Sequence, residues 1–320
     1  MGSATRQRAV TGRSPSGARA FAHFAPLGLT LRVEASNAEL IRAVAAACRG
    51  WEAPAEPGGA GLHLHLQVGP VPLGGAEPLV RAEGSRLSIS GGVAAAADAD
   101  LGRAWCRVGD ARAFDDPALR ERVLDCLILW LVTRNGRTPL HAAGIVAGGT
   151  AILLAGRSGS GKSCLALAAH RAGFPLISDD TVYVEMESRF RIRGVPRPIH
   201  LFAKDVPGHG PGPIRWRNGK RKHAVALPIP AQPVTADRAV LCVLDRGGDK
   251  ARLEPLAPDA ARAALGPPEP GFDLLADDIA VVLNRITHRG AWRLRLSHDP
   301  AEAVDLLAAN QALLAEWAAS

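Results

Sequence analysis

Long hydrophobic runs are absent from this sequence of 320 residues. The longest strongly apolar stretch, VLDCLILWLV (123–132), has only ten residues and includes an aspartate, so it is too short to span a bilayer. The N-terminus is basic and lacks an apolar stretch followed by a cleavage site, which argues against a secretory signal. We therefore expect no membrane segment, and we expect residues 1–20 to be disordered.

Cysteines are few, odd in number and scattered. None of the five belongs to a C-x-x-C pair, so the sequence predicts neither a disulfide framework nor a zinc cluster, and a reducing cytoplasm fits this usage. His63 and His65 alternate along a predicted strand, but no third ligand is close to them in the sequence. We interpret them as part of an exposed polar face.

The composition is that of a globular α/β protein with a basic balance. Hydrophobic residues make up 47% of the chain, which is enough for a buried core, and the formal charge is +7. This charge suits nucleic acid, ATP or an acidic peptide equally well, so charge alone does not identify the partner.

Two structured regions are predicted. A smaller α/β module spans residues 21–112, with a strand marked by Leu31 and Val33 and a helix capped by Ser36. We treat the alanine-rich stretch GGVAAAADADLG (91–102) as a loop. A helix opened by Asp116 and a proline leads into the larger domain, residues 113–320. Acceptor recognition is a hypothesis for the first module.

The stretch GRSGSGKS (156–163) matches the phosphate-loop pattern G-x-x-x-x-G-K-[ST] at every position. An apolar strand, AILLA, precedes it and a helix, KSCLALAAHRA, follows, as an anion cradle of backbone N–H groups at a helix N-terminus requires. Lys162 is expected to reach the β- and γ-phosphates, and Ser163 to offer a hydroxyl to Mg²⁺. The predicted nucleotide contacts are Gly156, Arg157, Ser158, Gly159, Ser160, Gly161, Lys162, Ser163 and Cys164.

An aspartate pair follows in LISDDTVYVE (176–185). We predict that PLISDD is a short buried strand and that TVYVEM continues it. If this strand neighbours the phosphate-loop strand, Asp179 and Asp180 face the γ-phosphate, where one carboxylate can hold Mg²⁺ and the other can accept a proton. The alternative is a turn or a helix cap without a catalytic role.

With these motifs in place, residues 139–185 resemble the catalytic core of the HPr kinase/phosphorylase family. The resemblance is closer to the HPr-kinase-related proteins, which include kinases of lasso-peptide precursors. It implies a P-loop kinase domain of the HPr-kinase type beside a smaller N-terminal α/β module. It also implies that His141 lies near the active centre, that Asp179 is the general base, and that Asp180 is its metal-side partner together with Ser163.

The sequence departs from the family where a glutamate precedes the Ile-Arg-Gly triplet. Arg191 occupies that position, and VPRPIHLF (195–202) replaces the longer family signature. These departures argue against HPr itself as the acceptor and against the phosphorylase direction.

A basic segment, RWRNGKRKH (215–223), surrounds an Asn-Gly hairpin signal. Lys220 and Arg221, with Arg197 upstream, form a candidate clamp for phosphates or for an acidic acceptor. An ordinary solvated turn and a nucleic-acid finger that stacks bases on Trp216 are the alternatives.

The sequence thus predicts an ATP- and Mg²⁺-dependent kinase acting on a hydroxyl, with serine of a peptide or protein as the expected acceptor, for example a natural-product precursor peptide. One alternative is a kinase of a sugar or amino acid. Another is a nucleotide-binding regulator or a nucleic-acid-associated ATPase. We expect a hydroxyl-bearing peptide or protein as partner rather than nucleic acid, and homo-oligomerisation is compatible with the sequence.

Overall fold

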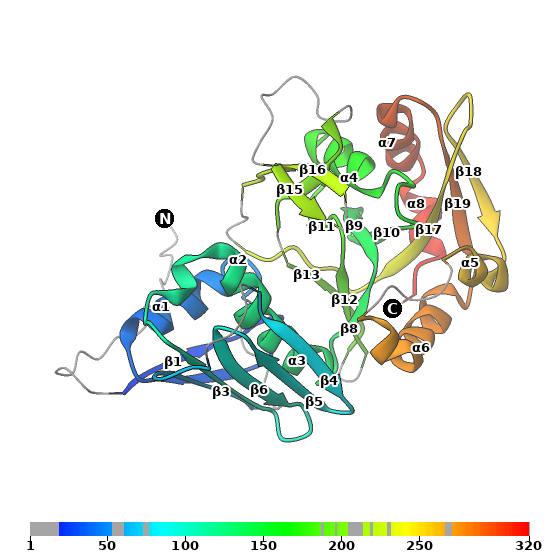
Figure 1. Cartoon of the computed structure of the whole chain (residues 1–320). Coiled ribbons are helices and arrows are strands. Elements are labelled where there is room, and N and C mark those ends of the chain that lie inside the picture. The colour runs from blue at the N-terminus through cyan, green and yellow to red at the C-terminus, as the bar shows by residue number, and fades with distance from the viewer. Residues whose placement is uncertain are drawn as a thin grey trace, which may run out of the picture. The chain divides into compact units, whose positions relative to one another are not determined.

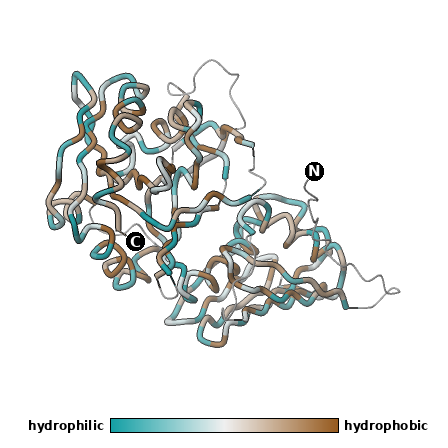
Figure 2. Tube along the Cα trace, turned by 180° about the vertical axis from the view of Figure 1, so that it is seen from behind, coloured by the Kyte–Doolittle hydropathy of each residue, from teal (hydrophilic) through white to brown (hydrophobic). Residues whose placement is uncertain are grey.

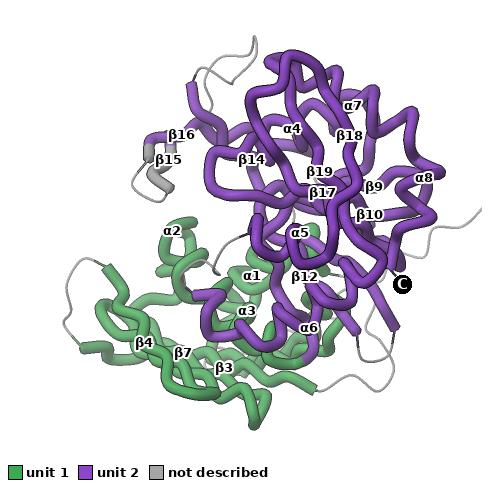
Figure 3. The backbone as a smooth tube through the Cα atoms, turned by 90° about the vertical axis from the view of Figure 1, so that its right-hand side faces the viewer, with its two compact units in different colours: residues 1–135 green, residues 136–320 purple. Residues whose placement is uncertain are grey.

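The chain forms two compact units in the computed structural model, residues 1–135 and 136–320 (Figure 3). The residues that the structure describes are 19–52, 61–72, 77–186, 189–195, 197–203, 214–217, 220–228, 232–265 and 271–319. Most of the segment predicted to be disordered, residues 1–18, therefore lies outside the described residues. The boundary at 135/136 differs from the predicted one at 112/113, because the helical segment that follows residue 113 packs on strands of the first unit.

The first unit is a seven-stranded mixed sheet with helices on one face (Figure 1). Its strands are β1 (Ala20–Phe24), β2 (Leu31–Ala35), β3 (Leu62–Val68), β4 (Leu79–Glu83), β5 (Arg86–Ser90), β6 (Val93–Asp98) and β7 (Arg103–Val108), in the order β1-β2-β3-β7-β6-β5-β4. Its helical elements are α1 (Ala38–Ala47), η1 (Ala113–Asp115), α2 (Pro117–Arg120), the π-helical turn η2 (Glu121–Asp125) and α3 (Cys126–Thr133). Because side chains alternate across a strand, every second residue of β2 is buried and the residues between them face away from the core.

Two local predictions in the first unit were wrong. The N-cap of α1 is Asn37, whose side chain accepts a hydrogen bond from the Glu39 amide at 2.8 Å, while the Ser36 hydroxyl accepts one from the Val68 amide of β3 at 2.9 Å. The alanine-rich stretch is not a loop but contains strand β6. Ala95 and Ala97 are buried there, and their small side chains let α3 pack closely against the sheet.

The second unit is built around a six-stranded sheet (Figure 1). Its strands, in spatial order, are β11 (Leu176–Ser178), β9 (Ala142–Ala147), β10 (Thr150–Ala155), β17 (Ala239–Arg246), β19 (Ala291–Leu296) and β18 (Arg252–Leu256). The helices are α4 (Lys162–Arg171), α5 (Pro258–Leu265), η4 (Asp273–Leu275), α6 (Ala276–Thr287), α7 (Pro300–Ala309) and α8 (Gln311–Glu316). Two three-stranded sheets complete the unit: β13 (Arg191–Gly194) with β12 (Val182–Glu185) and β8 (Thr138–Leu140), and β14 (Ile199–Leu201) with β16 (Lys220–Val225) and β15 (Ile214–Arg217).

The six-stranded sheet is buried on both faces. Every residue of β10 is buried; Ile152 and Leu154 belong to the core shared with α4 and α7, whereas Ala151 and Leu153 belong to the core shared with α6 and β12. Figure 2 shows the apolar character of these central strands in brown. Among the helices that the structure describes, none is both long and apolar enough to cross a membrane.

The strand that carries the aspartate pair does not continue as predicted. β11 pairs antiparallel with β9, whereas β12 joins the separate sheet with β8 and β13, so the chain changes sheets between Ser178 and Val182. β11 is also not a neighbour of β10. Because β9 is antiparallel to both strands, β10 and β11 run in the same direction, and their carboxyl ends lie at the same edge of the sheet.

A buried ion-pair network holds the strand that follows the aspartates. Glu185 of β12 accepts from Arg193 of β13 at 3.2 Å and lies 3.4 Å from a guanidinium nitrogen of Arg137, and none of the three side chains is more than 5% exposed. Arg191, at the position where the family has glutamate, instead pairs with Asp237 at 2.8 Å. Arg193 of the Ile-Arg-Gly triplet therefore has a structural partner.

Gly194, the last residue of the triplet, allows β13 to pass directly against β11. A Cβ atom at this position would lie 2.1 Å from the carbonyl oxygen of Ile177 and 2.7 Å from its carbonyl carbon. A backbone carbonyl cannot move aside as a flexible side chain can. Only glycine allows this approach. The backbone that β13 approaches is that of Ile177, two residues before Asp179.

Gly194→Ala is expected to destabilise the second unit by about 3 kcal/mol or more, because the strands must separate to admit the methyl group. Urea unfolding followed by circular dichroism measures this. Gly61→Ala is the matched control, since a Cβ there meets nothing within 4 Å. An equal effect of the two substitutions would contradict the close approach.

Candidate active site

The loop 156–161 joins the carboxyl end of β10 to α4, as the motif predicted. Gly161 precedes the helix with φ of 105°, in the left-handed region that favours glycine, and its carbonyl accepts from the Leu165 amide at 2.9 Å. The first N–H groups of a helix have no partners within the helix, and they carry the positive end of its dipole. The N-terminus of α4 therefore has the geometry and charge that favour an anion, and it lies at the edge where β11 also ends.

Lys162 is held against its own loop. Its side chain is buried, and its ammonium group donates to the Gly156 carbonyl at 2.6 Å. Lys162 and Ser163 both line a cavity of about 370 Å³ that opens over the loop. The ammonium thus lies where it can contact a phosphate held by the loop amides.

Asp179 is buried beside the loop. Its carboxyl accepts hydrogen bonds from the Ser163 hydroxyl and from the His200 backbone amide, and its exposed fraction is 6%. Burial raises the pKa of the Asp179 carboxyl to about 7, the neighbouring Asp180 carboxylate adds to the rise, and the hydrogen bonds oppose it. The structure therefore joins the aspartate pair to the predicted metal-side serine through Asp179.

Asp180 occupies a different environment from Asp179. Its side chain is 65% exposed, and its Oδ1 lies 3.7 Å from Nδ1 of His141. Both residues line the 370 Å³ cavity together with Lys162 and Ser163. Of the predicted catalytic residues, Lys162 and His141 thus line this cavity beside Asp180, whereas Asp179 lines a separate cavity of about 490 Å³ and is linked to the site through Ser163.

Ser163, Asp179 and Asp180 supply the oxygen donors that Mg²⁺ prefers. No group of three or more His, Cys, Asp and Glu side chains with metal-binding geometry occurs in the described part of the chain. A hydroxyl and two carboxylates suit Mg²⁺ that also binds phosphate oxygens and water better than they suit a metal held by protein ligands alone. The residues present fit the predicted cofactor.

None of the predicted clamp residues with a described side chain lines the cavity of about 370 Å³, the phosphate cavity. Lys222 of β16, which the prediction did not name, lines it instead, and its ammonium lies 5.4 Å from the centre of the Phe202 ring. Arg221 is exposed and does not line this cavity. Arg197 lines a different cavity, of about 490 Å³. The side chain of Lys220 and the turn residues 218–219 lie outside the described residues.

Sequence reasoning missed Arg246 and His200, which also line the phosphate cavity. The Arg246 guanidinium lies within 3.6 Å of the position that a Cβ on Gly161 would occupy. Arg246 ends the buried strand β17, which runs parallel to β10, and ligands bind at the carboxyl ends of such strands. The sequence therefore contained a signal for Arg246, which stands at the carboxyl end of a predicted buried strand. It contained no comparable signal for His200.

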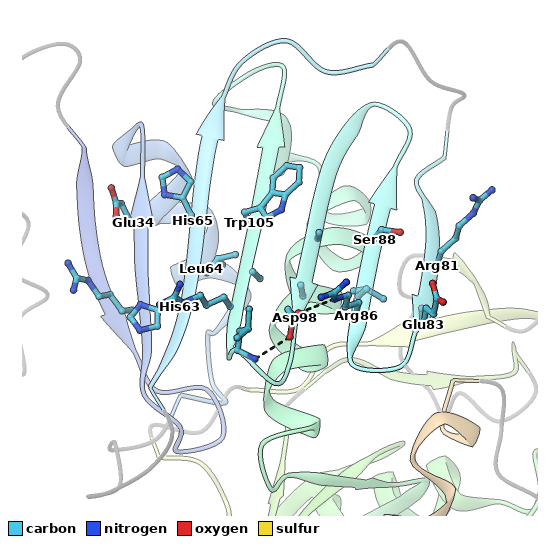
Figure 4. Close-up of a pocket in the computed structure, with 18 residues that line it drawn as sticks. Glu34, His63, Leu64, His65, Arg81, Glu83, Arg86, Ser88, Asp98 and Trp105 are labelled. Carbon is cyan, nitrogen blue, oxygen red and sulfur yellow. Dashed lines mark hydrogen bonds and ion pairs between the residues drawn. The ribbon is translucent and has the colours of Figure 1, made fainter.

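The first unit has its own cavity, of about 1220 Å³, on the open face of its sheet (Figure 4). His63 and His65 line it, as expected of a polar face, and in the register of the strands His65 lies between Glu34 and Trp105. Asp98 pairs there with Arg86 at 3.2 Å. No phosphate-binding loop contributes to this face, so the candidate catalytic site is the one in the second unit.

No family model and no curated protein matches this chain. Solved structures do match, among them the Hpr(Ser) kinase/phosphatase from Coxiella burnetii, at 16% identity and a TM-score of 0.24, with 55% of this chain and 97% of that chain covered. At this identity and score, the likeness indicates neither the activity nor the acceptor of this chain.

Asp179→Asn is expected to raise the melting temperature of the metal-free protein at pH 8 by about 4 °C or more, and by less at pH 5. The folded state holds the Asp179 proton up to a pKa of about 7, whereas the unfolded carboxyl ionises near 3.8, so stability falls as pH rises between these values. The neutral amide removes this loss.

Differential scanning calorimetry in EDTA at the two pH values measures the effect. Asp180→Asn is the control and should change the melting temperature less, because its carboxyl is mostly exposed. The same gain for Asp179→Asn at both pH values would contradict the burial argument.

Proposed function

We propose that this chain is an ATP-dependent kinase that transfers the γ-phosphoryl group to a hydroxyl, with serine of a peptide or protein as the acceptor. One observation carries the proposal: the cavity over the phosphate loop contains Lys162, Ser163, Asp180 and His141 together. A regulator that only binds nucleotide requires the loop and one carboxylate on the Mg²⁺ side, but it does not require a second carboxylate and a histidine that face the same space.

The reaction is an in-line displacement at the γ-phosphorus. The acceptor oxygen forms a bond to phosphorus, the bond from phosphorus to the β–γ bridging oxygen breaks, and ADP leaves. The acceptor proton passes to a carboxylate, and we assign this role to Asp180, which is open to the cavity and is positioned by His141 at 3.7 Å. This exchanges the roles that the family resemblance implies, because Asp179 contacts Ser163 instead.

Cationic groups and amides of the chain would bind the triphosphate. The N-terminal amides of α4, Lys162, Lys222 and Arg246 surround the cavity with positive charge, which stabilises the charge that spreads over the transferring group. Mg²⁺ held by Ser163 and Asp179 would supply charge neutralisation between the β- and γ-phosphates.

The exposure of Asp180 supports a peptide or protein acceptor over a small molecule. A kinase of a sugar or free amino acid requires a pocket that closes around the acceptor and excludes water. Here the proposed base is 65% exposed, so a hydroxyl on a chain too large for the 370 Å³ cavity can still reach it.

Asp180→Asn is expected to lower phosphoryl transfer by about 10²–10⁴-fold while it leaves nucleotide affinity nearly unchanged. Asp179→Asn is expected to weaken the Mg²⁺-dependent part of nucleotide binding. Transfer is measured by intact mass on a mixture of serine peptides with randomised flanks, and nucleotide binding by calorimetry with and without Mg²⁺.

Full transfer by Asp180→Asn would remove this residue from the base role. Transfer to sugars or free amino acids instead of peptides would favour the small-molecule kinase. Hydrolysis of ATP that single-stranded nucleic acid stimulates, without transfer to any hydroxyl, would overturn the kinase proposal.

Lys222→Ala is expected to weaken ATP binding about tenfold or more, because an ammonium facing the cavity is lost. Arg221→Ala is the matched control: it removes a neighbouring cation from the same strand, but one that does not line the cavity. Calorimetric titration with ATP separates the two variants. Equal losses would show that only the overall charge of the strand matters.

A further inference from the structure

Two further cavities flank the one over the phosphate loop, and they are lined by different elements. One, of about 870 Å³, lies between the loop, α5 and α6, and shares His141 and Ser158 with the phosphate cavity. The other, of about 540 Å³, lies between α4 and the start of α7, and shares Gly161, Cys164 and Arg246 with it. A nucleotide has two ends, so the two neighbours need not hold the same group.

The loop sets the direction of the nucleotide. In a phosphate loop the backbone amides hold the α- and β-phosphates, and the lysine and the serine act at the β- and γ-phosphates. Asp179 contacts Ser163, and Asp180 lies beside His141, which marks the His141 side as the γ-phosphate end. The base end then extends past Cys164, toward the cavity at the start of α7.

The cavity at the base end offers polar groups to a base and a ribose beside its apolar lining. Ser297, His298 and Asp299 line it together with Arg246 and Arg171. These side chains offer hydrogen-bond donors and acceptors that match the edges of a base and the hydroxyls of a ribose.

The cavity at the γ-phosphate end is mainly apolar. Two arginines line it: Arg157 of the loop is exposed, and Arg262 donates to the Thr287 hydroxyl at 3.1 Å and pairs with Asp259. The ring of Phe272 lies 6.3 Å from that of His141, so apolar surface begins directly beside the proposed catalytic groups. The apolar lining residues are Leu140, Leu265, Phe272, Ile279 and Leu283, with alanines between them.

We propose that this cavity between α5 and α6 receives a large apolar side chain next to the acceptor serine. The inference rests on the proposed kinase function and adds the class of acceptor: a peptide whose serine is flanked by an aliphatic or aromatic residue. A free sugar or a polar amino acid gains nothing from such a surface. The volume, about 870 Å³, is within the range that ligand pockets have and exceeds the space that one side chain needs.

Two serine peptides test the proposal: acetyl-Gly-Leu-Ser-Leu-Gly-amide and acetyl-Gly-Gly-Ser-Gly-Gly-amide. In the presence of Mg²⁺ and a non-hydrolysable ATP analogue, we expect the leucine peptide to bind about tenfold or more tightly, as burial of one leucine side chain implies. With ATP, the ratio of kcat/KM for the two peptides should show a similar preference.

Two variants test which cavity the leucine side chain occupies. Ala280→Trp fills the apolar cavity from an exposed position on α6, so it should reduce the preference for leucine to about twofold or less and leave affinity for the ATP analogue unchanged. Ala301→Trp is the matched control, an exposed alanine on α7 that lines the cavity at the base end. It should weaken binding of the analogue and preserve the leucine preference. Melting temperatures confirm that both variants fold.

The outcomes separate this inference from the kinase proposal. Equal binding of the two peptides, no binding of either at millimolar concentration, or a loss of nucleotide affinity in Ala280→Trp would overturn the apolar acceptor site. Preferential binding of the leucine peptide without any transfer would support the cavity assignment and would count against the kinase.

Discussion

A carboxylate shielded from water beside the Ser163 hydroxyl is the constraint on which the site depends. Burying the charge of Asp179 is unfavourable, and hydrogen bonds from its own amide, the His200 amide and the Ser163 hydroxyl offset part of that penalty. The arrangement requires β11 to end at the same edge as β10, although β9 lies between them. It also requires β13 to pass within backbone contact of β11, which the glycine at position 194 permits.

This constraint places the two adjacent aspartates in different surroundings. Asp179 points into the protein against the loop, whereas Asp180 points outward beside His141. Under the proposed function, Asp179 acts on the side of Ser163 and Asp180 on the side open to an acceptor, and phosphoryl transfer uses carboxylates in both places. The change of sheet between β11 and β12 produces this division, because the turn between them directs successive side chains to different surroundings.

Positive charge at the site comes from segments that are far apart in the sequence. Lys162 is the first residue of α4, Lys222 lies in a strand of the small sheet with β14, and Arg246 ends β17. Part of the net charge of +7 is therefore concentrated around a cavity of about 370 Å³. Charges fixed in this way need little rearrangement when charge develops in the transition state. In the proposed orientation, the cavity between α5 and α6 lies at the γ-phosphate end of the nucleotide and the cavity at the start of α7 lies at its base end.

The sequence by itself determined the phosphate loop, its strand and helix, and the capping of α2 by Asp116, because each depends on residues within about ten positions of one another. It also identified the aspartate pair and the basic segment as functional candidates. Only the tertiary structure decided that β11 and β12 belong to different sheets, that Asp179 and not Asp180 contacts Ser163, and that Lys222 and Arg246 line the cavity. It also showed that the alanine-rich stretch is a buried strand. These outcomes depend on which distant segments pack together, and that choice is made by burial and backbone pairing across the whole unit rather than by local pattern.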